Sequence, residues 1–244
     1  MTKKLAIDIG GYTHVGGRDH NDDVFGFTSK VVAVSDGMGG HPDGDLAAKV
    51  AVDTFLKFFK RKGGPTQPRE RVEAAFMEAL VAVCLLGKSR AYHGSRKPGC
   101  TLVGALITRQ NMAYIASMGD SRLTLINGVE LRQITTDHNI PGAALAEGRL
   151  TREQARKHPA SNTLLKCLGA GNESEAPDLF RVELAPGMKL VLTTDGVHGV
   201  LTDDELVKAQ RGQGTAANRA RLLVEAAIDA DTSDNATCLV LRCT

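Results

Sequence analysis

Four aspartates of the 244-residue chain stand where apolar stretches meet turns, three of them beside a glycine and one beside an asparagine. They are Asp36, Asp120, Asp195 and Asp234. Acidic side chains that pack close together repel one another and raise one another's pKa, and a bound cation is the usual remedy. The four residues therefore predict a metal site wherever their strand ends converge. Spacing alone is equally compatible with four unrelated turns.

The donor types indicate which ions such a site would take. The set is made of carboxylates, and no His or Cys has a spacing suited to join it. Hard ions such as Mg²⁺ or Mn²⁺ prefer oxygen ligands, whereas zinc sites draw on nitrogen and sulfur. Two such ions about 3.5 to 4 Å apart recur in enzymes that hydrolyse phosphate esters. The chemistry that this set favours is metal-assisted hydrolysis.

The segment 31–41, VVAVSDGMGGH, shows how one of these carboxylates would be mounted. Four apolar residues, mostly β-branched, predict a buried strand that ends by presenting Asp36 in a tight turn. The glycines that follow allow the main chain or a ligand to approach closely. An ordinary Asp-Gly turn gives the same pattern, so this segment alone does not decide between the two interpretations.

Strands and then two helices are predicted in the first 95 residues. Short apolar runs predict strands at 5–9, 12–15, 24–27 and 31–34. Two helices then follow from apolar residues spaced three or four apart. The first, marked by Ala47, Ala51, Phe55 and Phe58, ends near Lys60, and the second, marked by Val72, Phe76, Leu80 and Val83, fades near Gly94. Both helices are interpreted as core-packing elements without chemistry.

The later part of the chain is predicted to be mostly antiparallel sheet, because short turns join consecutive strands. Asn127 and Gly128 predict a tight hairpin between two of them. Another helix, marked by Ala220, Leu223 and Ala227, comes before the last strand. The strands are expected at 100–108, 112–118, 122–126, 129–134, 178–184, 189–197 and after Asp234.

Residues 137–170 differ from the rest in being polar, with few long apolar runs. Thr151 and Gln154 form a capping box that predicts a short helix there, and Thr202 and Glu205 form a second box further on. A polar insertion of this kind serves as a lid or is an ordinary surface excursion, and the composition fits both.

The bulk composition predicts a single globular domain over residues 1–244, with 42% apolar residues to fill its core. A net charge of +2 and only 4% aromatic residues argue against a nucleic-acid partner. Five scattered cysteines indicate buried thiols in a reducing compartment. Neither a signal peptide nor an apolar run of the ~20 residues that span a membrane is found, so a cytoplasmic protein without membrane contact is expected.

A series of short motifs, taken in order, resembles the metal-dependent protein serine/threonine phosphatases of type 2C in their compact bacterial form. The resemblance runs from about residue 10 to residue 242, and it implies an α+β fold in four layers. Two packed antiparallel sheets would lie between pairs of helices, with 137–170 as the variable flap. The motifs are RDHNDD (18–23), DGMGGH (36–41), GCTL (99–102), GDSR (119–122), TDH (136–138), TDG (194–196) and DNAT (234–237).

The resemblance also implies roles for individual residues. Asp36 would bridge two Mn²⁺ or Mg²⁺ ions, and the carbonyl of Gly37 would bind one of them. Asp195 and Asp234 would complete the second site, and Asp120 would help to hold the third ion that bacterial members often carry. A water or hydroxide bridging the ions would attack the phosphorus of phosphoserine or phosphothreonine directly.

Further positions of the motif RDHNDD carry implied roles. Arg18 matches the arginine that binds the substrate phosphate, and the planar fork of a guanidinium suits two phosphate oxygens. Asp22 stands where the family usually has Glu and would reach a metal through water, although its side chain is one methylene shorter. Asp23 would support the cluster from behind.

One departure from the family concerns the proton donor. Animal members place a histidine after the Asp-Gly, but here that position is Met38, and a thioether has no proton to donate. Metal-bound water is one substitute for that histidine. His41 is nearby in sequence, but a structural role in capping the turn is the favoured interpretation. The identity of the general acid stays open.

The resemblance implies phosphorylated proteins as partners. These would include a cognate Ser/Thr kinase and its substrates, such as forkhead-associated proteins, with a monomer as the default state. A competing hypothesis is a catalytically weak regulator that binds phosphoproteins, which would need a lost metal ligand. The family also includes small-molecule phosphatases and partner-switching regulators of transcription, and either function is a third hypothesis for this chain.

Overall fold

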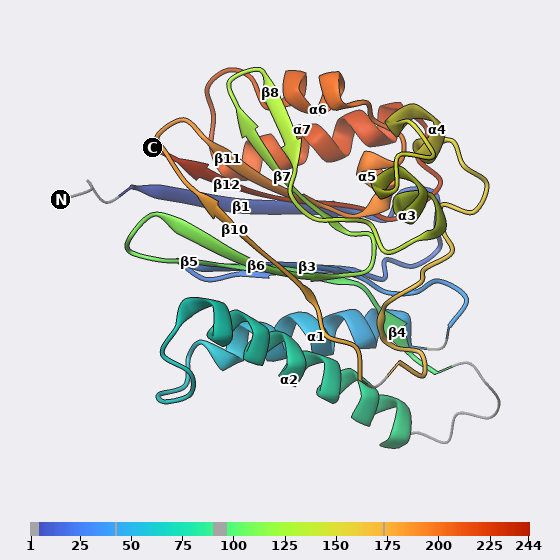
Figure 1. Ribbon diagram of the computed structural model, residues 1–244. Coiled ribbons are helices and arrows are strands. Elements are labelled where there is room, and N and C mark those ends of the chain that lie inside the picture. The colour runs from blue at the N-terminus through green and yellow to red at the C-terminus, as the bar shows by residue number, and fades with distance from the viewer. Residues whose placement is uncertain (1–4, 42, 90–96, 173) are drawn as a thin grey trace.

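The computed structural model describes residues 5–41, 43–89, 97–172 and 174–244. Two five-stranded antiparallel sheets lie face to face (Figure 1). The first has the order β1 (Ile7–His14), β12 (Ala236–Cys243), β11 (Lys189–Thr193), β7 (Arg122–Asn127), β8 (Glu130–Gln133). The second has the order β10 (Asp178–Glu183), β6 (Met112–Met118), β5 (Leu102–Ile107), β3 (Val31–Asp36), β2 (Asp23–Phe27). A two-stranded ladder joins β4 (Gly99–Cys100) to β9 (Leu168–Gly169).

Helices cover the outer face of each sheet, which confirms the predicted four-layer αββα arrangement (Figure 1). The second sheet is covered by α1 (Gly44–Phe58) and α2 (Pro68–Ser89). The first sheet is covered by α6 (Asp203–Ala209) and α7 (Ala216–Asp229). Three shorter helices lie at one end of the sandwich: α3 (Ile140–Ala146), α4 (Arg152–Arg156) and α5 (Asp195–His198).

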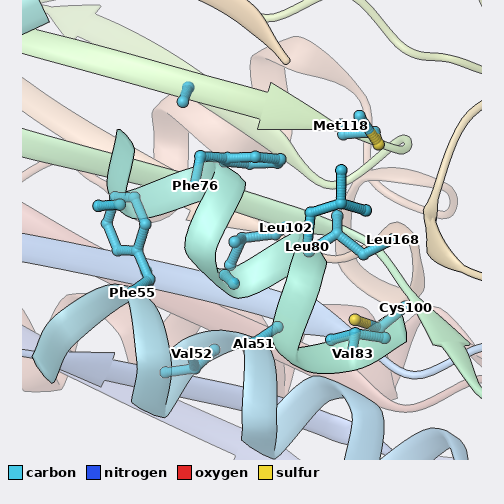
Figure 2. Close-up of a cluster of buried hydrophobic side chains, with 14 of the residues drawn as sticks. Ala51, Val52, Phe55, Phe76, Leu80, Val83, Cys100, Leu102, Met118 and Leu168 are labelled. Atoms are coloured by element: carbon cyan, nitrogen blue, oxygen red, sulfur yellow. The ribbon is translucent and has the colours of Figure 1, made fainter. Parts of the chain in front are cut away.

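Alternation along the strands builds the core between the sheets. In β11, Leu190 and Leu192 point to the inter-sheet core, whereas Val191 between them joins the layer under α7. A third apolar layer separates the second sheet from α1 and α2, where Phe55, Phe76 and Leu80 are fully buried (Figure 2). Full burial of each such side chain contributes about 1.5 to 3 kcal/mol, so these layers hold the strand ends rigidly.

Several local predictions are confirmed. The Thr151–Gln154 and Thr202–Glu205 capping boxes both form, at the starts of α4 and α6. The hairpin between β7 and β8 forms, but its turn is Gly128 and Val129, one residue later than predicted, because Asn127 ends β7 opposite Glu130. Gly128 has the positive φ that such a turn requires. Four of the cysteines are buried thiols.

Within the described residues, no helix combines the length and the apolar character needed to cross a membrane.

Two strand predictions are wrong, and both errors lie beside the acidic residues. The expected strand 189–197 ends at Thr193, and Asp195–His198 forms a helical turn instead. The expected strand 100–108 is interrupted at Thr101, which leaves the sheet to bind the chain around Asp36.

The start and the first helical region also differ from the prediction. The runs 5–9 and 12–15 form one continuous strand, β1, across Gly10 and Gly11. A Cβ on Gly10 would lie 2.3 Å from the backbone of Ala217, so the glycine allows α7 to pack directly on the strand. The second helix extends to Ser89, and Gly94, where it was expected to fade, lies outside the described residues.

Candidate active site

The strand-end aspartates come together in one open pocket of about 370 Å³, here called the catalytic pocket. Both sheets contribute to it, because β3 of the second sheet and β11 and β12 of the first end beside it. Arg18, Gly37 and Met38 are part of the lining, and so are the predicted acidic ligands Asp22, Asp36, Asp120, Asp195 and Asp234.

Asp36 is fixed by a reciprocal pair of bonds with Thr101. The amide of Asp36 donates to Thr101 Oγ1 at 2.9 Å, and the amide of Thr101 donates to the Asp36 carbonyl at 2.8 Å. The same hydroxyl lies 2.7 Å from Ser121 Oγ, next to Asp120. Thr101 thus braces two acidic turns at once. The motif GCTL contains it, but nothing in the sequence assigned it a role.

Gly37 is a point of close backbone approach. It is buried, and its amide donates to the Asp22 carbonyl at 3.1 Å. A Cβ at this position would lie 2.4 Å from the backbone of Gly44 at the start of α1. Any other residue would push α1 away from the end of β3, so glycine is required here.

Asp23 lies directly behind the catalytic pocket. In the β2–β3 ladder it stands opposite Asp36, and it is only 5% exposed. Its Oδ2 accepts a hydrogen bond of 2.7 Å from Thr194 Oγ1, which in turn accepts from the Thr237 amide at 3.0 Å. This chain of bonds joins the two sheets beneath the pocket. Asp23 thus lies next to Asp36 but outside the pocket lining.

Asp120 is bonded to the insertion. Asn139 Nδ2 donates to Asp120 Oδ2 at 3.0 Å and to the Ser161 carbonyl at 2.9 Å. Its Oδ1 accepts from the Gly142 amide at 2.8 Å and so caps α3. One buried side chain therefore links an acidic residue of the pocket to two parts of the flap. Sequence reasoning did not single out Asn139.

Arg18 and Asp234 form an ion pair at the mouth of the pocket. Arg18 Nη2 lies 2.7 Å from Asp234 Oδ2, and Asp234 Oδ1 accepts from the Asn235 amide at 2.9 Å. Asn235 also holds the motif RDHNDD in place, because it accepts from the Asp22 amide and donates to the His20 carbonyl. The family resemblance implies separate roles for Arg18 and Asp234 and does not anticipate their pairing.

His41 is outside the lining of the catalytic pocket. Its Nδ1 lies 2.7 Å from the Lys97 carbonyl, and its amide donates to the Met38 carbonyl at 3.2 Å. These contacts tie the DGMGGH turn to the chain that precedes β4.

Burial and mutual repulsion raise the pKa of three aspartates of the acidic cluster. Burial is the main cause that raises the pKa of Asp36 well above its usual range, and the charges of Asp23, Asp195 and Asp120 add to it. Burial and the charge of Asp195 raise the pKa of Asp120 to about 8. Burial and the charge of Asp234 raise the pKa of Asp195 to about 6. Such a cluster is stabilised by any added positive charge.

A buried carboxylate oxygen of Asp195 in the pocket fits a cation. Asp195 Oδ1 and Asp23 Oδ1 have no hydrogen-bond partner within the described chain. Among the same residues, no group of three or more His, Cys, Asp or Glu side chains is already arranged to hold a metal ion. Two of the four strand-end acids are engaged elsewhere, Asp234 by Arg18 and Asp120 by Asn139.

The flap closes one side of the catalytic pocket. It contains α3, α4 and β9, and its residues Asn162 and Leu164 reach the pocket lining. At its start, Asp137 accepts a bidentate pair of bonds from Arg122, with Nη2 and Oδ2 2.6 Å apart. The insertion is thus anchored to β7 and to Asp120.

Comparison with known proteins gives consistent matches along nearly the whole chain. The family model described as protein phosphatase 2C matches residues 10–227. The serine/threonine phosphatase stp of Listeria monocytogenes is 31% identical over 233 residues, which cover 92% of this chain and 91% of that protein. The protein phosphatase PhpP of Streptococcus pneumoniae is 32% identical and covers 85% of this chain and 83% of its own.

A solved structure agrees with these matches. The serine/threonine phosphatase Stp1 of Staphylococcus aureus superimposes with a TM-score of 0.87 at 28% identity, covering 99% of this chain and 97% of that one. The similarity therefore includes both sheets, their helices and the flap.

Proposed function

The chain belongs to the protein phosphatase 2C family, and from this premise we propose that it is a metal-dependent phosphatase that hydrolyses phosphoserine and phosphothreonine in proteins. The observation that carries the proposal is the acidic cluster of the catalytic pocket, with the unpartnered Oδ1 of Asp195 and an arginine at its mouth. Family membership alone would leave the activity of this chain open, because activity depends on the site.

The acidic residues divide into those that would hold ions and those that support them. Asp36 would bridge two Mn²⁺ or Mg²⁺ ions, with the Gly37 carbonyl on one ion and Asp195 and Asp234 on the other. Asp22 would contact a metal ion through a water molecule. Asp120 would serve a third ion, and Asp23 keeps its own bond to Thr194 and supports Asp36 across the ladder.

When bound, two such ions supply an acidic water as nucleophile and neutralise the clustered carboxylates. Arg18 binds the phosphate, because its guanidinium stands at the pocket mouth with donors left beyond the one that meets Asp234. There it would stabilise negative charge on the phosphoryl oxygens during transfer. Met38 lines the pocket without a proton to give, and His41 is bonded elsewhere, so neither is assigned as the acid for the leaving oxygen.

The physiological substrates would be proteins phosphorylated by a Ser/Thr kinase, forkhead-associated proteins among them. The names of the relatives support phosphoprotein substrates. The pairing with a particular kinase rests on analogy within the family.

Phosphate release from phosphoserine and phosphothreonine peptides tests the proposal, with and without Mn²⁺ and with a chelator. We expect turnover that requires the ion and is lost on chelation. Turnover insensitive to the chelator would overturn the metal mechanism. A folded protein that binds the phosphopeptide but never releases phosphate would support the competing hypothesis, a regulator that binds phosphoproteins.

A further inference from the structure

A second cavity adjoins the catalytic pocket beside the flap. A cavity of about 220 Å³ shares Asp120, Asn162 and Asp195 with the catalytic pocket. Beyond it lies a cavity of about 370 Å³, here called the outer pocket, which shares Arg122, Arg156 and His198 with the middle one. The three cavities are therefore neighbours, and the outer pocket lies between α4 and α6.

The outer pocket is lined by several charged groups, most of which are already paired. Arg122 is neutralised by Asp137, which also accepts from Gln133 at 2.8 Å. The other pairs are exposed and lie at the pocket rim: Arg152 with Asp203 at 3.5 Å, and Glu153 with Lys157 at 2.8 Å.

Arg156 is the exception. It projects from α4 at the junction of the middle and outer cavities, half-buried, and its Nη1 donates to the Val200 carbonyl at 3.3 Å. Within the described part of the chain it has no ion pair. Glu205, a neighbouring acid, is held by the amide and hydroxyl of Thr202 at 2.7 Å. A guanidinium has five N–H donors, so most of those on Arg156 are available to a ligand.

The positive charge available to an anion in the outer pocket is that of Arg156, although Glu153 and Glu205 lie near enough to interact with it. His198 lines the same cavities, and burial holds its pKa well below its usual range, so its ring is neutral and leaves the recognition to the arginine. The outer pocket, at about 370 Å³, is many times larger than the roughly 30 Å³ of a water molecule. It therefore has room for a side chain and its hydration. Partial burial strengthens a charge-assisted bond relative to one in open solvent.

We propose that the outer pocket binds an anionic side chain of the substrate, a carboxylate or a second phosphoryl group, that flanks the phosphorylated residue, and that Arg156 recognises it. The inference rests on the proposed phosphatase function. It adds a substrate class to it: phosphoproteins whose target residue lies in an acidic or multiply phosphorylated sequence.

Peptides with one phosphothreonine and a single Asp, or a single second phosphoserine, moved through the flanking positions test the inference. We expect kcat/KM to rise about three- to tenfold over the all-neutral peptide at one or two neighbouring positions. Raising the salt from 0.05 to 0.5 M should reduce this preference, because screening weakens a partly exposed charge pair. A larger rise in kcat/KM with the second phosphoserine than with Asp would identify the doubly phosphorylated substrate as the better ligand.

Matched variants separate recognition from support of the flap. Arg156→Gln should abolish the preference for the anionic peptide, and Arg156→Lys should keep part of it. Arg149→Gln is the control, because Arg149 lies in the same flap, is exposed and pairs with Glu147. It should keep the full preference. If Arg156→Gln lowers activity on neutral and anionic peptides equally, Arg156 only supports the fold of the flap and the proposal is wrong.

Two further results are decisive. Equal activity on all the peptides, wherever the Asp or phosphoserine is placed and at every salt concentration, would overturn the proposal that the outer pocket binds an anionic side chain. It would leave the phosphatase function intact. Should Arg156→Gln fail to fold, the lysine variant and the salt series of the native protein carry the same test. Absence of turnover on every peptide would instead count against the proposed function itself.

Discussion

The two walls of the catalytic pocket are built in contrasting ways. The wall that carries Asp36 and Asp23 belongs to β3 and β2, where buried strands and the Thr101 and Thr194 hydroxyls fix the carboxylates. The opposite wall is the flap, held by short capped helices and by surface ion pairs such as Glu147 with Arg149. Exposed pairs of this kind are worth about 0 to 1 kcal/mol, far less than the buried layers under the sheets.

This difference separates what must stay fixed from what can vary. Metal chemistry requires ligands placed to within a fraction of an ångström, and two packed sheets provide that. Recognition of different protein substrates needs a surface that tolerates change, and an insertion with few core residues provides it. Substitutions in the two walls should therefore differ strongly in their effects.

The largest effect is expected in the wall formed by β3 and β2, here called the strand wall. Asp36→Asn should reduce phosphopeptide turnover about 10³-fold and eliminate Mn²⁺ binding measured by calorimetry, because an amide cannot bridge two cations. The melting temperature without metal should not fall, since the change removes a source of repulsion among buried acids. Asp53→Asn, on the exposed side of α1, is the control and should behave like the native protein. Retained turnover in Asp36→Asn would remove this residue from the bridging role.

The second prediction concerns pH and also tests the strand wall. A carboxyl whose pKa is raised in the folded state binds its proton more tightly there than in the unfolded chain. Stability therefore falls as the pH rises from the ordinary value to the folded value. With pKa values of about 6 for Asp195 and about 8 for Asp120, the metal-free protein should lose stability between about pH 4 and pH 8.

Calorimetric melting at several pH values measures this effect. We expect the melting temperature of the metal-free protein to drop by roughly 5 to 10 °C over that range. Added Mn²⁺ should restore it at neutral pH, because an ion that binds only the folded state stabilises it. A flat profile without metal would mean that the acids are not buried together as described.

The third prediction tests the link between the walls. Asn139→Ala removes the bonds to Asp120 and the Ser161 carbonyl together with the cap of α3, and should lower kcat/KM about tenfold. The loss of the cap itself costs about 1 kcal/mol. Thr215→Ala removes the cap of α7, far from the pocket, and should cost similar stability without loss of activity. Equal losses of activity in both variants would show that stability alone is responsible.

The smallest effect is expected within the flap. Thr151→Ala breaks the capping box of α4 and should change kcat/KM on a phosphopeptide with neutral flanking residues by no more than about twofold, because that helix is short and exposed. Hydrogen exchange of the amides 152–156 should accelerate, whereas exchange in β3 stays slow. A large loss of activity here would contradict the contrast between the two walls.

Much of this organisation can be predicted from the sequence, and the reasons differ between residues. Asp36 at the end of an apolar strand is a local pattern, and the capping boxes of α4 and α6 are local as well. That the acidic turns belong to one site followed from the order of motifs and not from any single spacing, because convergence of strand ends depends on the topology.

The misses share a physical origin. Thr101 interrupts a strand of good propensity because its hydroxyl and amide satisfy Asp36, and that partner is distant in sequence. The helical turn at Asp195 follows an apolar run that predicts a longer strand. The contacts of Arg18 with Asp234 and of Asn139 with Asp120 likewise join segments that only the folded chain brings together.

The pairing of β1 with β12 has a consequence for how the protein is made. Their ladder runs from Ile7 opposite Cys243 to His14 opposite Ala236, and β12 separates β1 from β11 in the first sheet. A ribosome adds about 5 to 20 residues per second, so β1 waits for more than ten seconds before its neighbour exists. Arg18 and Asp22 follow β1, and Asp234 precedes β12. A nascent chain that already contains all the other strands of the pocket would therefore still be inactive until β12 is synthesised.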